Sequence, residues 1–127
     1  MPKTYSNFVQ NNNIFNFGDI LNHYASQTPK KRFLTDLVLN QEFTYEDFNE
    51  LVNKTAHYLT QQDLSQGDIL SVVLENSWPY LAFYFACIKL GVVVDPFPTS
   101  LDPQELKRYI DYAVSNTHLT LPTNREV

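Results

Sequence analysis

Two short polar stretches stand where parallel α/β proteins commonly bind ligands. Glu75-Asn76-Ser77 joins an apolar segment to a predicted helix, and helix N-termini attract anions such as phosphate. This stretch lacks the glycines that let a backbone approach a phosphate, so helix capping by Ser77 is the favoured interpretation. Asp95 ends a predicted parallel strand, the edge where open α/β sheets bind ligands. A solvated turn residue before Pro96 is the favoured interpretation there.

The remaining residues with chemical potential are scattered along the chain. His23, His57 and His118 share no spacing typical of metal ligands. Cys87, the only cysteine, lies in an apolar stretch, and we expect an inert core thiol because reactivity needs an accessible thiolate. The run Lys30-Lys31-Arg32 is interpreted as a solvated turn. No complete active-site constellation can be assembled, so we assign no catalytic, cofactor-binding or metal-binding residue.

The elements that must position these residues alternate between strand and helix. In the first half we expect a helix over 19–27 capped by Asp19, a hairpin of strands 33–39 and 42–43 around a turn at 40–41, and a helix over 45–62. In the second half we expect a strand over 69–74, a helix over 78–90, a strand over 92–94 and a helix from 103. Strand and helix alternate with short connections in the second half. This order predicts an α/β fold with a parallel βαβ unit, preceded by a helix and a short hairpin.

Helix starts carry the strongest local signals. Thr44 with Asp47 three residues later is a variant of the capping box. Ser77 is expected to cap the next helix, and Gly91 to end it in the left-handed conformation. Asp102 followed by proline predicts the start of the last helix.

Composition bounds the class of protein. The chain has 127 residues, 43% of them hydrophobic, and a net charge of −5, which suits a globular domain and disfavours nucleic acid or an anionic membrane as the main partner. The longest apolar run, 78–94, is interrupted by Lys89 and Gly91 and is too short to span a bilayer. A single cysteine and no apolar leader are compatible with a cytoplasmic location.

The helix over 78–90 is apolar on every side, and Lys89 is its only charge. Such a helix belongs inside a larger structure, and so short a chain cannot easily cover both of its sides. We therefore expect this chain to be part of a larger, truncated α/β protein. It should expose apolar surface where the rest of the parent domain packs.

Residues 43–110 resemble the N-terminal part of AMP-forming acyl-CoA synthetases and related adenylate-forming ligases. That family shows Thr-Tyr-x-Glu/Asp before a helix with Asn and Ala, then Gly-Asp, Asn-Ser, Lys-x-Gly and a proline-containing turn. The matching positions here are Thr44, Tyr45 and Asp47; Asn53 and Ala56; Gly67 and Asp68; Asn76 and Ser77; Lys89 and Gly91; and Pro96. Asp95 replaces a usually small or apolar residue, and Pro98 stands where the family often has Asn. The resemblance extends over about residues 18–112.

The resemblance implies a two-step ligase. A carboxylate attacks the α-phosphate of ATP, with Mg²⁺ screening charge, and a thiol of coenzyme A or a carrier phosphopantetheine then takes the acyl group. In that family the phosphate loop, the nucleotide contacts and the catalytic lysine lie downstream of the part matched here. No functional residue is therefore carried onto this chain, and residues 18–112 are expected to be a partial AMP-binding domain that is inactive by itself. Residues 1–17 are expected to form a flexible arm.

Residues 113–127 resemble something other than a protein family. Val114, Ser115 and 117–123 match the in-frame translation of a transposase sequencing adapter, and Asn116 departs from it. We interpret the segment as a non-native tail, with a genuine polar extension as the alternative.

Two other interpretations of the chain stay open. It is alternatively a small stand-alone α/β interaction or ligand-binding module without catalysis. Such a module should have a polar outer face on the helix over 78–90, which the sequence lacks. The other is a product without function that exposes core surface and aggregates, and this is compatible with the fragment interpretation.

Overall fold

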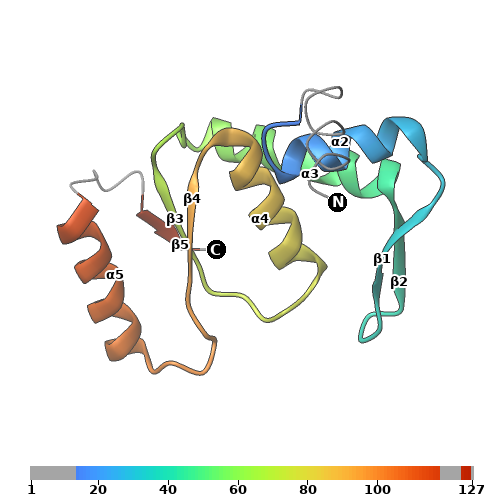
Figure 1. Cartoon of the computed structure of the whole chain (residues 1–127). Coiled ribbons are helices and arrows are strands. Elements are labelled where there is room, and N and C mark those ends of the chain that lie inside the picture. Colours follow the sequence, from blue (N-terminus) through green and yellow to red (C-terminus); the bar gives the residue numbers. More distant parts are fainter. Residues whose placement is uncertain (1–13, 118–123, 127) are drawn as a thin grey trace, which may run out of the picture.

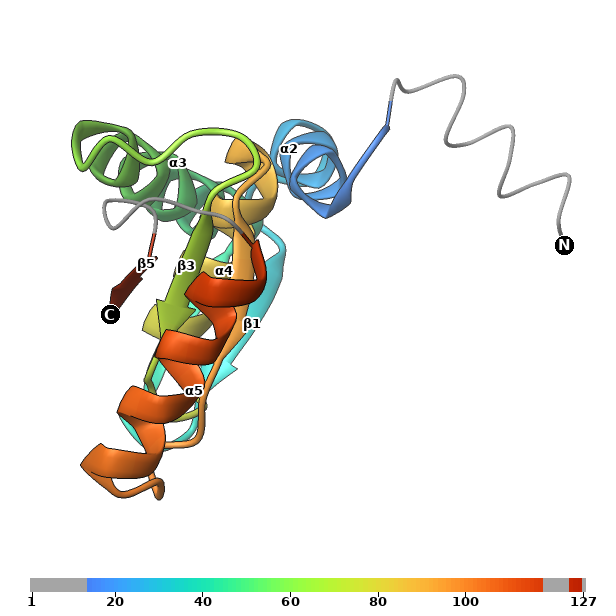
Figure 2. The same cartoon turned by 90° about the vertical axis from the view of Figure 1, so that its left-hand side faces the viewer.

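The computed structural model describes residues 14–117 and 124–126 (Figure 1). Its elements are α2 (Phe17–Gln27), β1 (Arg32–Asp36), β2 (Gln41–Thr44), α3 (Tyr45–Gln61), β3 (Ile69–Val72), α4 (Trp78–Leu90), β4 (Val93–Pro96), α5 (Pro103–Thr117) and β5 (Asn124–Glu126). The helices α2, α3 and α4 pack together, and the β1–β2 hairpin extends from them. Figures 1 and 2 together place the sheet of β3, β4 and β5 between α4 and α5.

The second half of the chain forms the predicted parallel unit. The strand order is β4-β3-β5, and β3 is parallel to both neighbours. Ile69 pairs with Val93, and Ser71 pairs with Asp95. The helix α4 connects the two parallel strands β3 and β4. The α/β class, with a helix and an antiparallel hairpin before the βαβ unit, is confirmed.

The core lies where α3, α4 and β3 meet. Phe48, Val52 and Leu59 form the buried stripe of α3, because residues three or four apart share one helix face. They pack with buried residues of β3, including Leu70, and of α4, including Cys87. Aromatic rings from the hairpin close this core on one side, with Phe33 and Phe43 both in ring contact with Phe48.

Two of the predicted caps are present with their hydrogen bonds. The Asp47 N–H donates to Thr44 Oγ1 at 3.1 Å, and the Thr44 N–H donates to Asp47 Oδ2 at 3.4 Å. Asp102 Oδ1 accepts from two N–H groups in the first turn of α5. At the end of α4, Gly91 has φ +71°, the left-handed conformation expected of a C-terminal glycine.

The predicted start of the first helix is wrong. The helix α2 begins at Phe17, and its N-cap is Asn16, whose Oδ1 accepts from the Asp19 N–H at 3.0 Å. Asp19 is the third helical residue, and its carboxylate accepts a hydrogen bond from the Asn16 N–H at 3.2 Å. Asparagine and aspartate are both good N-caps. The reciprocal pair favours the earlier start because it satisfies two backbone donors.

The predicted strand ends also need correction. β1 stops at Asp36, and 37–40 form a turn that the sequence analysis assigned mostly to the strand. β3 ends at Val72, short of the expected Leu74. β4 continues past Val94 to Pro96. Proline is tolerated there because β4 is an edge strand of the described sheet, where a missing N–H costs no ladder bond.

The C-terminal segment has regular backbone over part of its length. α5 runs on to Thr117, and β5 pairs with β3 in the register Ile69 to Asn124. Residues 118–123 lie outside the described part, as do residues 1–13 of the predicted arm over 1–17. The boundary at residue 112 and the adapter origin of the tail stay predictions.

Candidate functional site

The turn between β3 and α4 caps the N-terminus of α4. Ser77 Oγ accepts from the Tyr80 N–H at 3.4 Å and donates to the Glu75 carbonyl oxygen at 2.9 Å. Helix capping, the interpretation favoured from the sequence, accounts for both bonds of the hydroxyl. A phosphate at this helix N-terminus would have to compete with Ser77 Oγ for the Tyr80 N–H.

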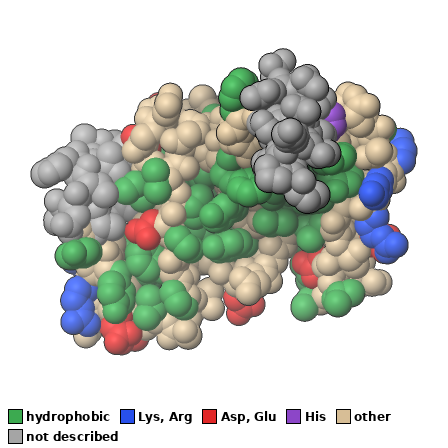
Figure 3. Space-filling view, in the orientation of Figure 1, with side chains coloured by type: hydrophobic (Ala, Val, Ile, Leu, Met, Phe, Trp, Pro, Cys, Tyr) green, Lys and Arg blue, Asp and Glu red, His purple; other side chains and the backbone are tan. Residues whose placement is uncertain are grey.

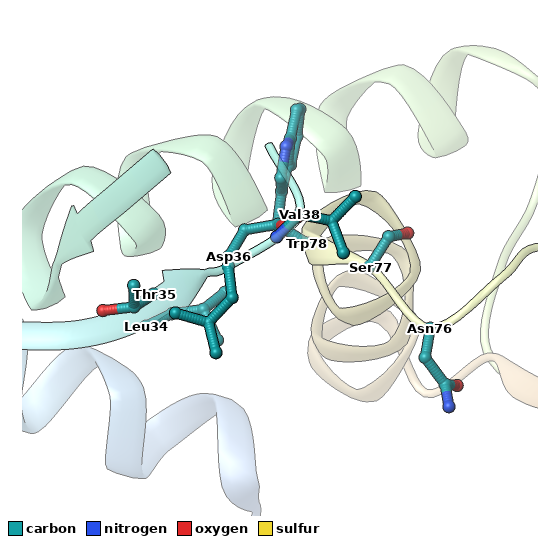
Figure 4. A pocket seen from close by; sticks show the side chains of 8 residues that line it. Leu34, Thr35, Asp36, Val38, Asn76, Ser77 and Trp78 are labelled. Atoms are coloured by element: carbon teal, nitrogen blue, oxygen red, sulfur yellow. The ribbon is translucent and has the colours of Figure 1, made fainter. Parts of the chain in front are cut away.

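A shallow pocket of about 320 Å³ lies beside this turn. Its lining residues come from the β1–β2 hairpin and the start of α4: Leu34, Thr35, Asp36, Leu37, Val38, Asn76, Ser77 and Trp78. In Figure 4 the side chain of Asn76 points away from Trp78 and the hairpin residues. The indole N–H of Trp78 is buried and has no hydrogen-bond partner in the described part of the chain. The pocket thus offers mainly an apolar wall and no charged group except Asp36, whose Oδ1 accepts from two backbone N–H groups of the hairpin turn.

Asp95 lies inside β4, so the interpretation of a solvated turn residue is wrong. It is half-buried opposite the fully buried Ser71 on β3. Burial raises the pKa of the Asp95 carboxyl above its usual value, because a low-dielectric environment disfavours the charged form. No hydrogen bond or ion pair of this carboxyl is seen within residues 14–117 and 124–126, and one acidic group without a partner makes no catalytic pair.

The histidines and the cysteine lie far from any common site. His57 is exposed on α3 and contacts the side-chain amide of Gln61 at 3.2 Å. The ring of His23 stands edge-on against Tyr24, and His118 lies outside the described residues. Cys87 is fully buried, and burial raises the pKa of its thiol to about 12. Within the described chain, no group of three or more His, Cys, Asp or Glu side chains is placed to hold a metal.

The basic run is engaged with acidic neighbours. Lys30 Nζ lies 2.7 Å from a carboxylate oxygen of Glu46, and an Arg32 guanidinium nitrogen lies 2.8 Å from Glu42. Arg32 is the first residue of β1, so the run is only partly a turn. Both ion pairs are exposed, where such pairs contribute little to stability.

Lys89, which the sequence did not mark as a site residue, forms a cluster of hydrogen bonds between helices. Lys89 Nζ donates to the side-chain oxygens of Asn22 at 2.9 Å, Asn49 at 2.7 Å and Asn53 at 2.7 Å. Asn22 belongs to α2 and the other two to α3, so one ammonium joins three helices. A Cβ on Gly18 would meet Lys89 Cγ at 2.5 Å, so only glycine leaves room for this side chain.

Burial lowers the pKa of the Lys89 ammonium, and the negative charge of Asp19 opposes that effect. The Lys89 cluster, defined as Lys89 with Asn22, Asn49 and Asn53, is a structural junction whose three donors are all used. The signal in the sequence was a single charge in an otherwise apolar helix, since a buried ammonium must find hydrogen-bond acceptors.

Comparison with known proteins identifies a family for this chain. The model of the AMP-binding enzyme family matches residues 21–127. Long-chain-fatty-acid–CoA ligase FadD13 of Mycobacterium tuberculosis is 28% identical over 91 residues, which are 72% of this chain and 18% of that protein. Nonribosomal peptide synthetase Ao415 of Arthrobotrys oligospora is 33% identical over 86 residues, which are 63% of this chain and 2% of that protein.

Similarity to solved structures agrees with the sequence relatives. The crystal structure of the N-terminal domain of FACL13 from Mycobacterium tuberculosis matches with a TM-score of 0.72 at 25% identity, over 81% of this chain and 25% of that one. The chain spans less than a fifth of the length of the curated relatives it matches. The family match over 21–127 and the shared N-terminal architecture lead to one conclusion: this chain belongs to the AMP-binding enzyme family.

Proposed function

We propose that residues 18–112 are scaffold of an ATP-dependent acid–thiol ligase and that this chain by itself activates no acid. The observation that carries the proposal is the family match over residues 21–127, supported by the likeness to the N-terminal domain of FACL13. In the parent enzyme a carboxylate oxygen would attack the α-phosphate of ATP, releasing pyrophosphate and forming an acyl-adenylate. A thiolate of coenzyme A or of a carrier phosphopantetheine would then displace AMP and form the thioester.

The names of the relatives support a proposal for the substrate class of the parent. FadD13 is named for long-chain fatty acids, and other relatives are named as acyl-CoA ligases or nonribosomal peptide synthetases. A carboxylic acid is common to these reactions, and we propose one as substrate of the parent, with ATP, Mg²⁺ and a thiol acceptor as its other requirements. We place the parent in the cytoplasm, where the buried thiol of Cys87 would stay reduced.

We infer that the described residues do not hold a nucleotide. The turn before α4 has no glycine and uses the Ser77 hydroxyl in its cap. A triphosphate needs converging backbone N–H groups or basic side chains, whereas the side chains of Lys30 and Arg32 are paired with glutamates and that of Lys89 with three asparagines. No step is therefore derived through ATP or Mg²⁺ on this chain.

The apolar helix α4 supports a scaffold role. Only Ala82, Ala86 and Cys87 of its 13 residues are fully buried, and Tyr84 is 40% exposed. Figure 3 shows hydrophobic side chains gathered over the centre of the face that carries α4 in Figure 1. We propose that other parts of the parent domain pack on this surface.

Among the described residues, every helix is too short or too polar to span a membrane.

ATP–pyrophosphate exchange tests the proposed inactivity. The purified 127-residue chain would be incubated with ATP, Mg²⁺, labelled pyrophosphate and a panel of fatty, aromatic and amino acids. We expect no exchange above a blank without acid. Exchange requires both the forward and the reverse adenylation step, and each step needs a site that binds the nucleotide. Exchange that depends on any acid of the panel would contradict the proposal.

A further inference from the structure

The central strand β3 belongs to a segment that is prone to pair with copies of itself. Residues 69–74 read Ile-Leu-Ser-Val-Val-Leu, without a charge, a proline or a glycine. Six-residue segments of high β-propensity and low charge pair with identical segments when they are exposed. The side chains of Leu70, Ser71 and Val72 are buried, so exposure of this segment would come at an edge of the strand, through its backbone.

One edge of β3 is paired with β4, whose own outer edge is protected. β4 contains Asp95 and ends at Pro96. Charged residues and prolines are the means by which natural edge strands avoid pairing with other molecules, and a proline lacks the N–H that a further strand would need. The sequence of β4 therefore disfavours growth of the sheet on this side.

The other edge of β3 is paired with β5. Leu70 is in register with Arg125, and Ser71 is in register with Glu126; both views in Figures 1 and 2 show β5 beside β3. Two of the three residues of β5 are charged. That composition is typical of a protected edge strand, whereas strands inside parallel sheets are usually apolar. β5 thus covers β3 and offers a poor edge for further pairing.

The two outer strands carry the protection that the central strand lacks. Without β5, the backbone N–H and C=O groups on one side of β3 would lose their partners, and unpaired backbone groups at a largely buried strand are unfavourable. The segment 69–74 of a second copy could pair with them over a longer stretch than the three residues of β5. Two identical strands related by a two-fold axis across the sheet edge would run antiparallel.

We propose that β5 blocks a self-association site of this chain, the edge of β3, and that two copies pair through residues 69–74 when β5 is displaced. The contact is made by backbone groups and does not involve α4. It therefore differs from association through the apolar surface of that helix, and it is independent of any activity of the parent enzyme.

Proline substitutions in β5 test the proposal in the full 127-residue chain. Consecutive N–H groups of a strand point to opposite sides, so Arg125→Pro with Glu126→Pro removes a donor toward β3 whichever of the two residues supplies it. Arg125→Thr with Glu126→Thr is the matched control, because it removes the same charges but keeps both N–H groups and suits a strand. The concentration at which dimers form, measured by light scattering, should fall by about tenfold or more in the proline variant relative to the threonine variant.

Amide hydrogen exchange locates the contact. In dilute solution the amides of Ile69–Val72 should exchange faster in the proline variant than in the threonine variant, because their strand partner is lost. As the protein concentration rises, protection of these amides should return, since a second copy then supplies the missing partner. Unchanged exchange in α3 and α4 would show that the core has kept its fold in both variants.

Three outcomes would overturn the proposal. Equal association of the two variants would show that pairing of the β5 backbone does not block it. Faster exchange in β3 without stronger association would show that the uncovered edge binds no second copy. Association that protects amides of α4 and leaves those of residues 69–72 unprotected would assign the contact to the apolar surface of the helix.

Discussion

Lys89 is the one charged residue of α4, and its ammonium meets Asn22 on α2 and Asn49 and Asn53 on α3. Asn53 and Lys89 both belong to the pattern by which the sequence resembles adenylate-forming ligases. Their 2.7 Å contact gives that pattern a physical reason. The lysine and the asparagine fix how α3 and α4 lie against one another.

Removing the ammonium should loosen the helices. Lys89→Met keeps the length of the side chain but leaves three amide oxygens without their donor, at a cost of about 2 kcal/mol. Local opening of α2 and α4 should become roughly thirtyfold more frequent, as measured by amide hydrogen exchange. Lys54→Met is the control, because Lys54 makes only an exposed ion pair with Glu50 and should change exchange little. Equal exchange in both variants would refute a structural role for the cluster.

Asp95 gives a prediction about pH. Its folded-state pKa lies above the ordinary value of 3.8, so between those two values the folded chain binds more protons than the unfolded chain. The stability of the β3–β4 region should therefore fall as pH rises through this window, and the penalty should be absent below the ordinary pKa. Asp95→Asn should remove the fall and slow amide exchange in β3 and β4 at pH 7. Glu75→Gln, at an exposed position, is the control, and a pH profile unchanged in Asp95→Asn would contradict this account.

At the scale of elements, local signals predicted the helices better than the strand ends. Helix caps are local signals, because each one satisfies backbone groups of its own helix. The sequence therefore predicted the caps at Thr44 and Ser77 and the terminal glycine at 91. The strand predicted to reach Leu39 ends at Asp36. The Asp36 carboxylate accepts from the N–H groups of Val38 and Leu39, and these bonds stabilise a turn in place of a longer strand. The hydrophobicity of 37–39 suggested a buried strand and gave no sign of an exposed tip.

The contacts of the Lys89 cluster were outside the reach of local patterns. They join residues 36 to 67 positions apart, and only the packing of three helices brings them together. The burial of Asp95 could not be predicted from local patterns either, because it depends on residues that are distant in the sequence, such as Ser71 on the neighbouring strand.

Gly91 at the end of α4 and Gly67 in the turn before β3 offer a matched pair of glycine substitutions. Gly91 has φ +71°, and an added Cβ would lie 2.9 Å from Gln66 Cγ. Gly67 has φ +89° with no atom within 4 Å of such a Cβ. Both alanine variants should lose about 1 kcal/mol or more to backbone strain, and Gly91→Ala should lose more because Gln66 must also move. Hydrogen exchange in the last turn of α4 measures the difference, and a larger effect from Gly67→Ala would contradict the steric argument.

At the scale of the whole molecule, the burial of α4 decides how the chain should unfold. Most of its large side chains are only half-buried, including those of Tyr80, Leu81 and Phe83. In α5 the ring of Tyr109 stacks on that of Phe97. We expect the isolated chain to melt over a broad range, with a calorimetric enthalpy that differs from the van't Hoff value. A sharp two-state transition of the monomer would instead favour a self-sufficient module.

The central claim is that the chain is the N-terminal scaffold of a longer adenylate-forming ligase, followed by a tail of foreign origin. One long sequencing read through the codon for Tyr112 at the source locus tests it most directly. The account predicts an open frame that leaves the adapter-like sequence and continues into a Ser/Thr/Gly-rich loop followed by lysine. A genuine stop codon after Val127 would contradict it and make a small binding module the better description.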